Sequence, residues 1–154
     1  MKRGDSERPG DAFDVGDVER RVDDVTARLI RSLEEGTLEA LDHHDHVRVA
    51  WGYLHRMSLA ETLVALPEVL RAYAAGKGLP DAYHETITFA FVCLIHERVV
   101  RHPGSSWRRF AEANPDLFER DLLGRYYPGG RLESDEARRV FLLPRPRNVM
   151  KENP

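Results

Sequence analysis

The sequence predicts an all-α fold: an up-down bundle of about four main helices, followed by short C-terminal helices. Apolar residues recur at spacings of three and four over most of the chain, and serine, asparagine, glycine and proline separate these stretches. No stretch has the convincing period-two alternation of a half-buried strand. The chain has 154 residues, of which 42% are hydrophobic and 32% charged, and this suits one domain with its own hydrophobic core.

The first two helices are predicted from apolar periodicity. Residues 15–34 form the first helix, which ends near Gly36. A second helix is predicted from Asp42 or His44 to Met57. The predicted apolar face of the first helix consists of Val15, Val18, Val22, Val25, Leu29 and Leu33.

A capping-box pattern begins the third predicted helix. Ser58 precedes an apolar stretch and Glu61 follows three positions later, so each side chain can bond to the backbone of the other residue. The apolar positions continue to about Ala75. Pro67 lies within this stretch and is expected to kink or split the helix, because proline has no amide hydrogen.

The fourth and longest helix is predicted over residues 82–102, with Asp81 as its N-cap. Nearly every position from residue 87 to residue 95 is apolar, so we expect this segment to be the central helix of the bundle. Phe91 and Leu94 are expected to be buried in the core.

Shorter helices are predicted beyond this point. Ser105 or Ser106 is the expected N-cap of one helix, and Pro115 stands at the first position of another. Residues 126–130 form a predicted turn, and Ser134 begins the last short helix.

Composition and charge limit the class of protein. We expect a disordered leader at residues 1–14, a helical domain at 15–143 and a basic tail at 144–154. The net charge of -3 argues against nucleic-acid binding by the whole domain. No apolar run approaches the roughly 20 residues that span a bilayer, and no signal peptide is present, so we expect no membrane contact and a cytoplasmic location. Cys93 is the only cysteine, which excludes an intramolecular disulfide and a multi-cysteine zinc site.

Two histidine-bearing segments are the strongest functional signal. His43, His44 and His46 stand at the start of the second predicted helix, and His84 stands at the start of the fourth. Short connections favour antiparallel neighbours, so the second and fourth helices should begin at the same end of the bundle. The end of the third helix, around Tyr73 and Lys77, should lie nearby.

These residue types suit a metal centre. The positive end of a helix dipole keeps histidine neutral, and neutral imidazole is the metal-binding form. His43, His46 and His84 are the predicted ligands, and Glu85 is a predicted fourth ligand or general base beside a metal-bound water. A divalent metal such as zinc, iron or manganese would fit this set. The alternative is that these are ordinary capping and surface histidines.

Further residues are candidate contacts to a ligand in the same region. They are His44, Arg48, Tyr83, Arg125 and Tyr126. Arginine and tyrosine side chains can bind a carboxylate or a phosphate. For residues 125–127 the sequence favours another interpretation, in which the aromatic side chains anchor the C-terminal segment to the bundle.

Four segments resemble a family of small bacterial helical proteins of uncharacterised function. They are His43–Trp51 (HHDHVRVAW), Tyr83–Thr88 (YHETIT), Arg125–Tyr127 (RYY) and Ser134–Arg138 (SDEAR). The resemblance covers roughly residues 35–145. It implies that these segments belong together, and it carries no reaction mechanism and no assignment of site residues.

Three functions remain open from the sequence. The leading one is a metal-dependent enzyme that acts on a small molecule through a histidine-rich pocket at one end of the bundle. The alternative is a non-catalytic module that uses the same pocket to bind a small ligand or a partner protein. The third is a homodimer that merely buries these side chains.

Overall fold

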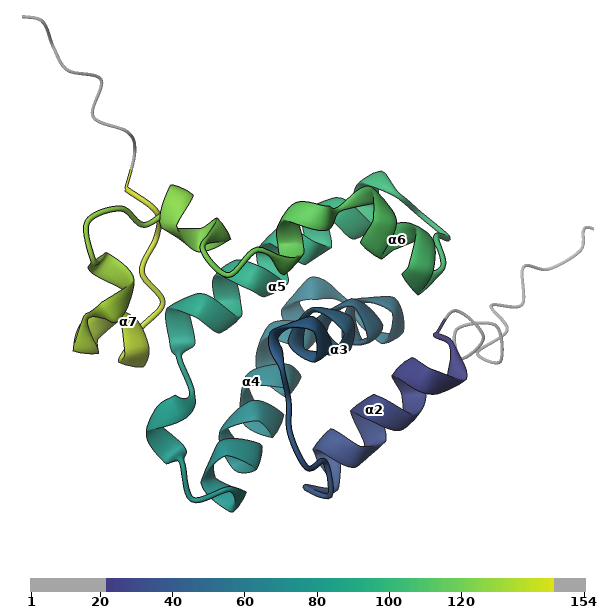
Figure 1. Cartoon of the computed structure of the whole chain (residues 1–154), viewed down its shortest axis with the longest axis horizontal. Helices are drawn as coiled ribbons and strands as arrows, with labels where there is room; N and C mark the ends of the chain where they lie inside the picture. The colour runs from purple at the N-terminus through teal and green to yellow at the C-terminus, as the bar shows by residue number, and fades with distance from the viewer. Residues whose placement is uncertain (1–21, 146–154) are drawn as a thin grey trace, which may run out of the picture.

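The computed structural model describes residues 22–145, and this part of the chain is all-α with no strand, as predicted (Figure 1). The predicted leader at residues 1–14 and residues 146–154 of the predicted tail lie outside the described residues. The α-helices are α2 (Asp24–Glu34), α3 (His43–Arg56), α4 (Leu59–Gly76), α5 (Glu85–Arg101), α6 (Trp107–Ala113) and α7 (Asp135–Arg139). Four short 3-10 helices connect them: η1 (Pro80–Ala82), η2 (Pro115–Phe118), η3 (Leu122–Arg125) and η4 (Arg131–Glu133).

Helix α2 begins later than predicted and buries a partly different set of side chains. Asp23 is its N-cap and accepts a hydrogen bond from the amide of Thr26 (2.8 Å), so the helix does not continue back through residues 22 and 23. Predicted helical residues 15–21 lie outside the described part of the chain. Thr26 and Ile30 are buried together with Leu33, whereas Val25 is 52% exposed. Val22 and Leu33 are buried as predicted and Leu29 is partly buried, whereas Thr26 and Ile30 were not predicted.

Helices α3 and α4 follow the predicted boundaries closely. Asp42 caps α3 through the amide of Asp45 (2.8 Å). The predicted capping box of α4 is present, since the Ser58 amide donates to Glu61 Oε2 (2.8 Å) and the Glu61 amide donates to Ser58 Oγ (3.2 Å). Pro67 does not split α4, which is one helix on both sides of the proline.

Helix α5 corrects two predictions. Its N-cap is His84, whose Nδ1 accepts from the amide of Ile87 (3.2 Å), and Asp81 belongs to the separate 3-10 helix η1. The predicted burial of Phe91 and Leu94 is wrong, because both are only partly buried. Val92 and Ile95 of α5 are each only 1% exposed, because other helices pack against α5. Phe91 is less buried because it lines a cavity.

Helix α3, rather than α5, is the central helix. It packs against α2, α4, α5 and η2, and Figure 1 shows it between α2 on one side and α5 on the other. Its buried side chains include Val47, Trp51 and Tyr53. The run of apolar residues in α5 has a different cause, since that helix also carries a second hydrophobic cluster.

The second cluster joins the C-terminal segment to α5. Ala90, Leu123 and Tyr127 form its buried centre. The Tyr127 hydroxyl donates to the carbonyl oxygen of Leu142 (2.7 Å), and Thr86 Oγ1 donates to the carbonyl oxygen of Val140 (2.8 Å). Helix α7 therefore lies beside the start of α5, away from α6 (Figure 1). The interpretation of residues 125–127 as an anchor holds for Tyr127.

Candidate functional site

A cavity of about 570 Å³ lies between α3, α4 and α5. Its lining includes residues from the first turn of α3 (His43, His46), from the last turn and the C-cap of α4 (Tyr73, Lys77) and from the start of α5. The predicted antiparallel order of these helices is therefore confirmed at this end of the bundle. The apolar part of the lining consists of Ala40, Leu41, Val47, Ala50, Leu66, Leu70, Ala74, Leu79, Ala82, Ile87, Phe91, Val92 and Ile95.

His43 and His46 line this cavity and each donate one ring N–H to a carbonyl oxygen. His43 Nε2 lies 2.9 Å from the carbonyl oxygen of Leu117, and His46 Nδ1 lies 3.1 Å from that of Asp42. A carbonyl only accepts, so the bonded nitrogen carries the proton in each ring. His43 Nδ1 and His46 Nε2 have no hydrogen-bond partner among the described residues, and in the neutral rings both are acceptors.

The surroundings of His46 favour its neutral form. Its pKa is lowered from its usual value of 6.5, chiefly because the surrounding protein desolvates the ring. The nearby His43 lowers the pKa further, and the hydrogen bond to Asp42 and the charges of Asp42 and Asp45 oppose this. The residue as a whole still reaches solvent.

His84 also lines the cavity, but both of its ring nitrogens are engaged. Its Nε2–H donates to the carbonyl oxygen of Leu132 (2.7 Å), and its Nδ1 accepts from the amide of Ile87. The side chain is 8% exposed. A metal could bind His84 only if one of these bonds were broken, so the ring acts here as a helix cap and as an anchor for η4.

Glu85 is held away from the histidines. Its Oε2 accepts from Arg71 Nη2 (2.6 Å) and from the Tyr83 hydroxyl (2.7 Å), and it does not line the cavity. Burial, and then the hydrogen bond to Glu85, raises the pKa of Tyr83 well above its usual range. The Arg71 guanidinium also lies over the Tyr83 ring, 4.7 Å from its centroid. This arrangement does not support the predicted role of Glu85 as a base beside the histidines.

One group of potential metal ligands is close together within residues 22–145, and it is not the predicted set. Ligand atoms of Asp42, His44 and Asp45 lie within 4.8 Å of one another at the exposed N-terminus of α3. Asp42 already accepts the capping bond there, and the positive end of the helix dipole disfavours a cation. A metal held by His43, His46 and His84 remains a prediction.

Two of the predicted ligand contacts lie elsewhere and stabilise the fold. The His44 ring stacks on Phe118 with centroids 5.0 Å apart. Arg48 donates to Asp23 Oδ1 (2.9 Å) and to Thr26 Oγ1 (2.8 Å), which ties α3 to the N-cap of α2. Neither residue lines the cavity between α3, α4 and α5.

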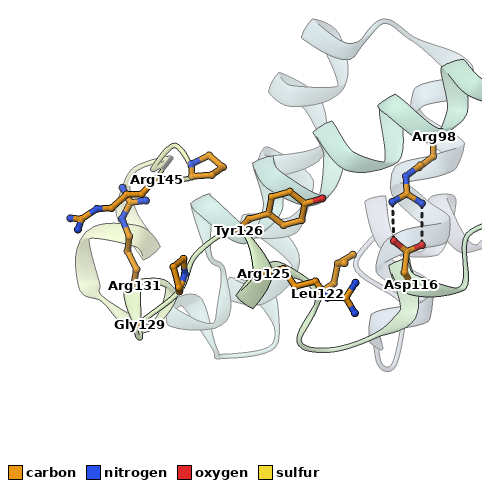
Figure 2. A pocket seen from close by; sticks show the side chains of 10 residues that line it. Arg98, Asp116, Leu122, Arg125, Tyr126, Gly129, Arg131 and Arg145 are labelled. Carbon is orange, nitrogen blue, oxygen red and sulfur yellow. Dashed lines mark hydrogen bonds and ion pairs between the residues drawn. The ribbon is translucent and has the colours of Figure 1, made fainter. Parts of the chain in front are cut away.

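Arg125 and Tyr126 line a separate groove of about 1360 Å³, shown in Figure 2. Sequence analysis missed the other arginines of this groove, Arg98, Arg131 and Arg145. Their positions share no periodicity, because they come from α5, η4 and the segment after α7. Lysine occurs only at positions 2, 77 and 151, so nearly all basic residues are arginine, but this composition does not say where the side chains gather.

No protein-family model, curated protein or solved structure matches the chain. None of the described helices combines the length and apolar character that crossing a bilayer requires. The fold and the site therefore define the protein only as an all-α helical bundle with a largely apolar cavity and histidines on its lining.

Proposed function

We propose that this domain is a non-catalytic module that binds a small molecule with an apolar body in the cavity between α3, α4 and α5. The observation that carries the proposal is the cavity itself. Its volume of about 570 Å³ falls in the range of roughly 300–1,000 Å³ that is typical of small-ligand sites. Apolar side chains form most of its lining, and a few polar groups stand among them, as in most such sites.

The histidines indicate the polar part of the ligand. His43 and His46 each donate one N–H to a carbonyl and present the other nitrogen as an acceptor. A ligand with a hydroxyl group, such as a phenol or an alcohol, could donate to one of them. Lys77 and Tyr73 line the cavity near its α4 side, and the Lys77 ammonium lies 5.5 Å from the centroid of the Tyr73 ring.

The metal-dependent enzyme has less support. Two of its four predicted residues, His84 and Glu85, are bonded to other protein groups, and they would have to give up these bonds to act on a substrate. Metal analysis of protein purified without a histidine tag tests this directly. One equivalent of zinc, iron or manganese, lost in a His43→Ala, His46→Ala double variant, would overturn the non-catalytic proposal in favour of the enzyme.

The test of binding uses 1-naphthol, which has an apolar ring and one hydroxyl donor. We expect it to bind with one-to-one stoichiometry, as measured by calorimetry or by its own fluorescence. Ala74 is 9% exposed and lines the cavity, so Ala74→Phe should occupy the space and weaken binding by about tenfold or more, a loss of about 1.4 kcal/mol.

The matched control is Ala75→Phe. Ala75 is the next residue of α4, is exposed and does not line the cavity. Its substitution should leave 1-naphthol binding unchanged. Equal binding by the two variants, each shown by circular dichroism to be folded, would contradict the proposal, as would no binding by the unsubstituted protein. 1-Methoxynaphthalene, which lacks the donor, should bind less tightly than 1-naphthol.

A further inference from the structure

The second groove collects positive charge in a chain whose net charge is -3. Four arginines line it: Arg98 on α5, Arg125 at the end of η3, Arg131 at the start of η4 and Arg145 after α7. Asp116 is the one carboxylate in the lining among the described residues. Segments far apart in the sequence therefore converge to build a basic surface, which Figure 2 shows.

The charges at one end of the groove are already neutralised. Arg98 donates to both carboxylate oxygens of Asp116 (3.0 and 2.8 Å) and to Asn114 Oδ1 (3.0 Å). The hydrogen bond from Arg98, opposed by partial burial, lowers the pKa of the Asp116 carboxyl. Arg125 Nη2 donates to Glu119 Oε2 (2.6 Å). This end already satisfies its guanidinium groups with protein carboxylates.

At the opposite end, two guanidinium groups have no carboxylate partner among the described residues. Arg131 donates through Nη1 to the carbonyl oxygen of Leu143 (2.5 Å), and its guanidinium lies 5.7 Å from the centroid of the Tyr127 ring. Neither Arg131 nor Arg145 forms an ion pair within residues 22–145, and Arg145 makes no side-chain hydrogen bond in that range. Figure 2 shows both at one end of the groove, away from Arg98 and Asp116. Gathering two like charges costs free energy that a bound anion would recover.

The groove also offers an aromatic surface between its two ends. Tyr126 lines the groove, is 38% exposed and lies in Figure 2 between the Arg131–Arg145 end and the Arg98–Asp116 end. A volume of about 1360 Å³ is far larger than a phosphate ion needs. Arginine forks bind phosphate oxygens in pairs, and an exposed tyrosine can stack with a flat ring.

We propose that this groove binds a small organic phosphate that carries a flat ring, the chemistry of a mononucleotide. Arg131 and Arg145 bind the phosphate, and Tyr126 contacts the ring. The site is separate from the cavity between α3, α4 and α5, so the proposal stands or falls independently of the proposed binding of an apolar ligand.

The experiment measures binding of AMP to the full chain by calorimetry. Arg145→Gln removes a guanidinium that makes no hydrogen bond within the described residues, so it should weaken AMP binding by about tenfold without affecting the fold. Arg131→Gln should have a similar effect, and Tyr126→Leu should weaken AMP binding but not pyrophosphate binding. Arg108→Gln is the control, because Arg108 is exposed on α6 outside the groove and pairs with Glu112.

Three outcomes would overturn the proposal. The first is the absence of AMP binding at millimolar concentration. The second is equal AMP affinity in the Arg145→Gln and Arg108→Gln variants. The third is equal affinity of the unsubstituted protein for AMP and inorganic phosphate, which would show that the ring contributes nothing. Adenosine, which lacks the phosphate, should bind much more weakly than AMP.

Discussion

Each of His43, His46 and His84 donates one ring N–H to a backbone carbonyl, so the fold determines which nitrogen of each ring carries the proton. The three rings differ in the use of their second nitrogen. His43 and His46 keep one acceptor nitrogen each, whereas His84 uses its second nitrogen to cap α5. A histidine at a helix start can thus be a ligand-facing group or a structural one, and its carbonyl and amide neighbours decide which.

The lowered pKa of His46 predicts a pH dependence of stability. The folded state binds a proton at His46 less readily than the unfolded chain does, so acid favours unfolding. The contribution of this residue to the free energy of unfolding should be present at about pH 7.5 and should decline as the pH falls through about 6.5 toward 5.

Urea denaturation of His46→Gln across this range checks the prediction. The variant should lose stability less steeply with acid than the unsubstituted protein, because glutamine does not titrate. His102→Gln, at the exposed C-cap of α5, is the comparison. If stability depended on pH in the same way in His46→Gln and in the unsubstituted protein, the predicted contribution of His46 would be wrong.

Replacement of threonine by valine should have opposite effects on stability at two fully buried positions. Thr62 and Thr86 are both 0% exposed. Thr62 Oγ1 has no hydrogen-bond partner among the described residues, whereas Thr86 Oγ1 donates to the carbonyl oxygen of Val140 and accepts from the amide of Leu142 (3.1 Å). Thr62→Val should raise the free energy of unfolding by about 1 kcal/mol, because it removes a buried polar atom that makes no bond.

Thr86→Val should instead lower the free energy of unfolding by about 1–3 kcal/mol, because it removes the buried hydroxyl that bonds to the Val140 carbonyl and the Leu142 amide. Chemical denaturation measures both variants. Destabilisation by Thr62→Val equal to that by Thr86→Val would show that Thr62 makes a bond in solution after all.

At the scale of elements, the α2–α3 contact depends on a glycine. A Cβ atom at Gly52 would lie 2.7 Å from Ile30 Cδ1 and 2.9 Å from Thr26 Cγ2. Thr26 cannot move easily, because its hydroxyl bonds to both Asp23 and Arg48. The absence of a side chain at position 52 therefore determines how closely the two helices approach.

The surroundings of Gly52 and Gly76 predict opposite changes in stability when each is replaced by alanine. Gly52→Ala should destabilise the fold by about 1–2 kcal/mol, because the steric cost exceeds the gain of about 1 kcal/mol in helix propensity. Gly76→Ala, at the end of α4 where a Cβ meets nothing within 4 Å, should stabilise by about 0.4–1 kcal/mol. Thermal or chemical denaturation distinguishes them, and a stabilising Gly52→Ala would mean that α2 can shift away from α3.

At the scale of the whole molecule, two hydrophobic clusters share α5. The larger cluster contains Trp51, Ile95 and Phe110, and the smaller one contains Ala90 and Tyr127. Phe91 and Leu94 pack against both clusters. His84 caps α5 and bonds to Leu132, which packs against the smaller cluster. A change at His84 should therefore act on the smaller cluster first.

Hydrogen exchange tests this division. His84→Ala should lower the free energy of unfolding by about 2 kcal/mol, the combined scale of a lost N-cap and a lost buried hydrogen bond. Amides of residues 126–143 should exchange faster, while those of α3 change little. His84→Asn retains a capping side chain and should restore part of the loss. Uniformly faster exchange across α3 and residues 126–143 would indicate one cooperative unit.

The sequence by itself determined what depends on neighbours along the chain. Helical periodicity, the Ser58–Glu61 capping box and the short connections predicted the all-α class, most helix boundaries and the common end of α3 and α5, because each of these is a local property or follows from loop length. The overestimated burial of Phe91 shows the limit. Periodicity shows which side of a helix is apolar, but only packing decides how much of it is covered.

Tertiary structure decided how each candidate residue is used. The distant carbonyl of Leu132 engages Nε2 of His84, whose Nδ1 caps α5 through the amide of Ile87, and Arg71 holds Glu85 away from the cavity. The arginine-lined groove joins residues from 98 to 145 that no local pattern connects. Partners of this kind are separated by tens of residues, so their effect on a side chain's charge and availability appears only when the helices have packed.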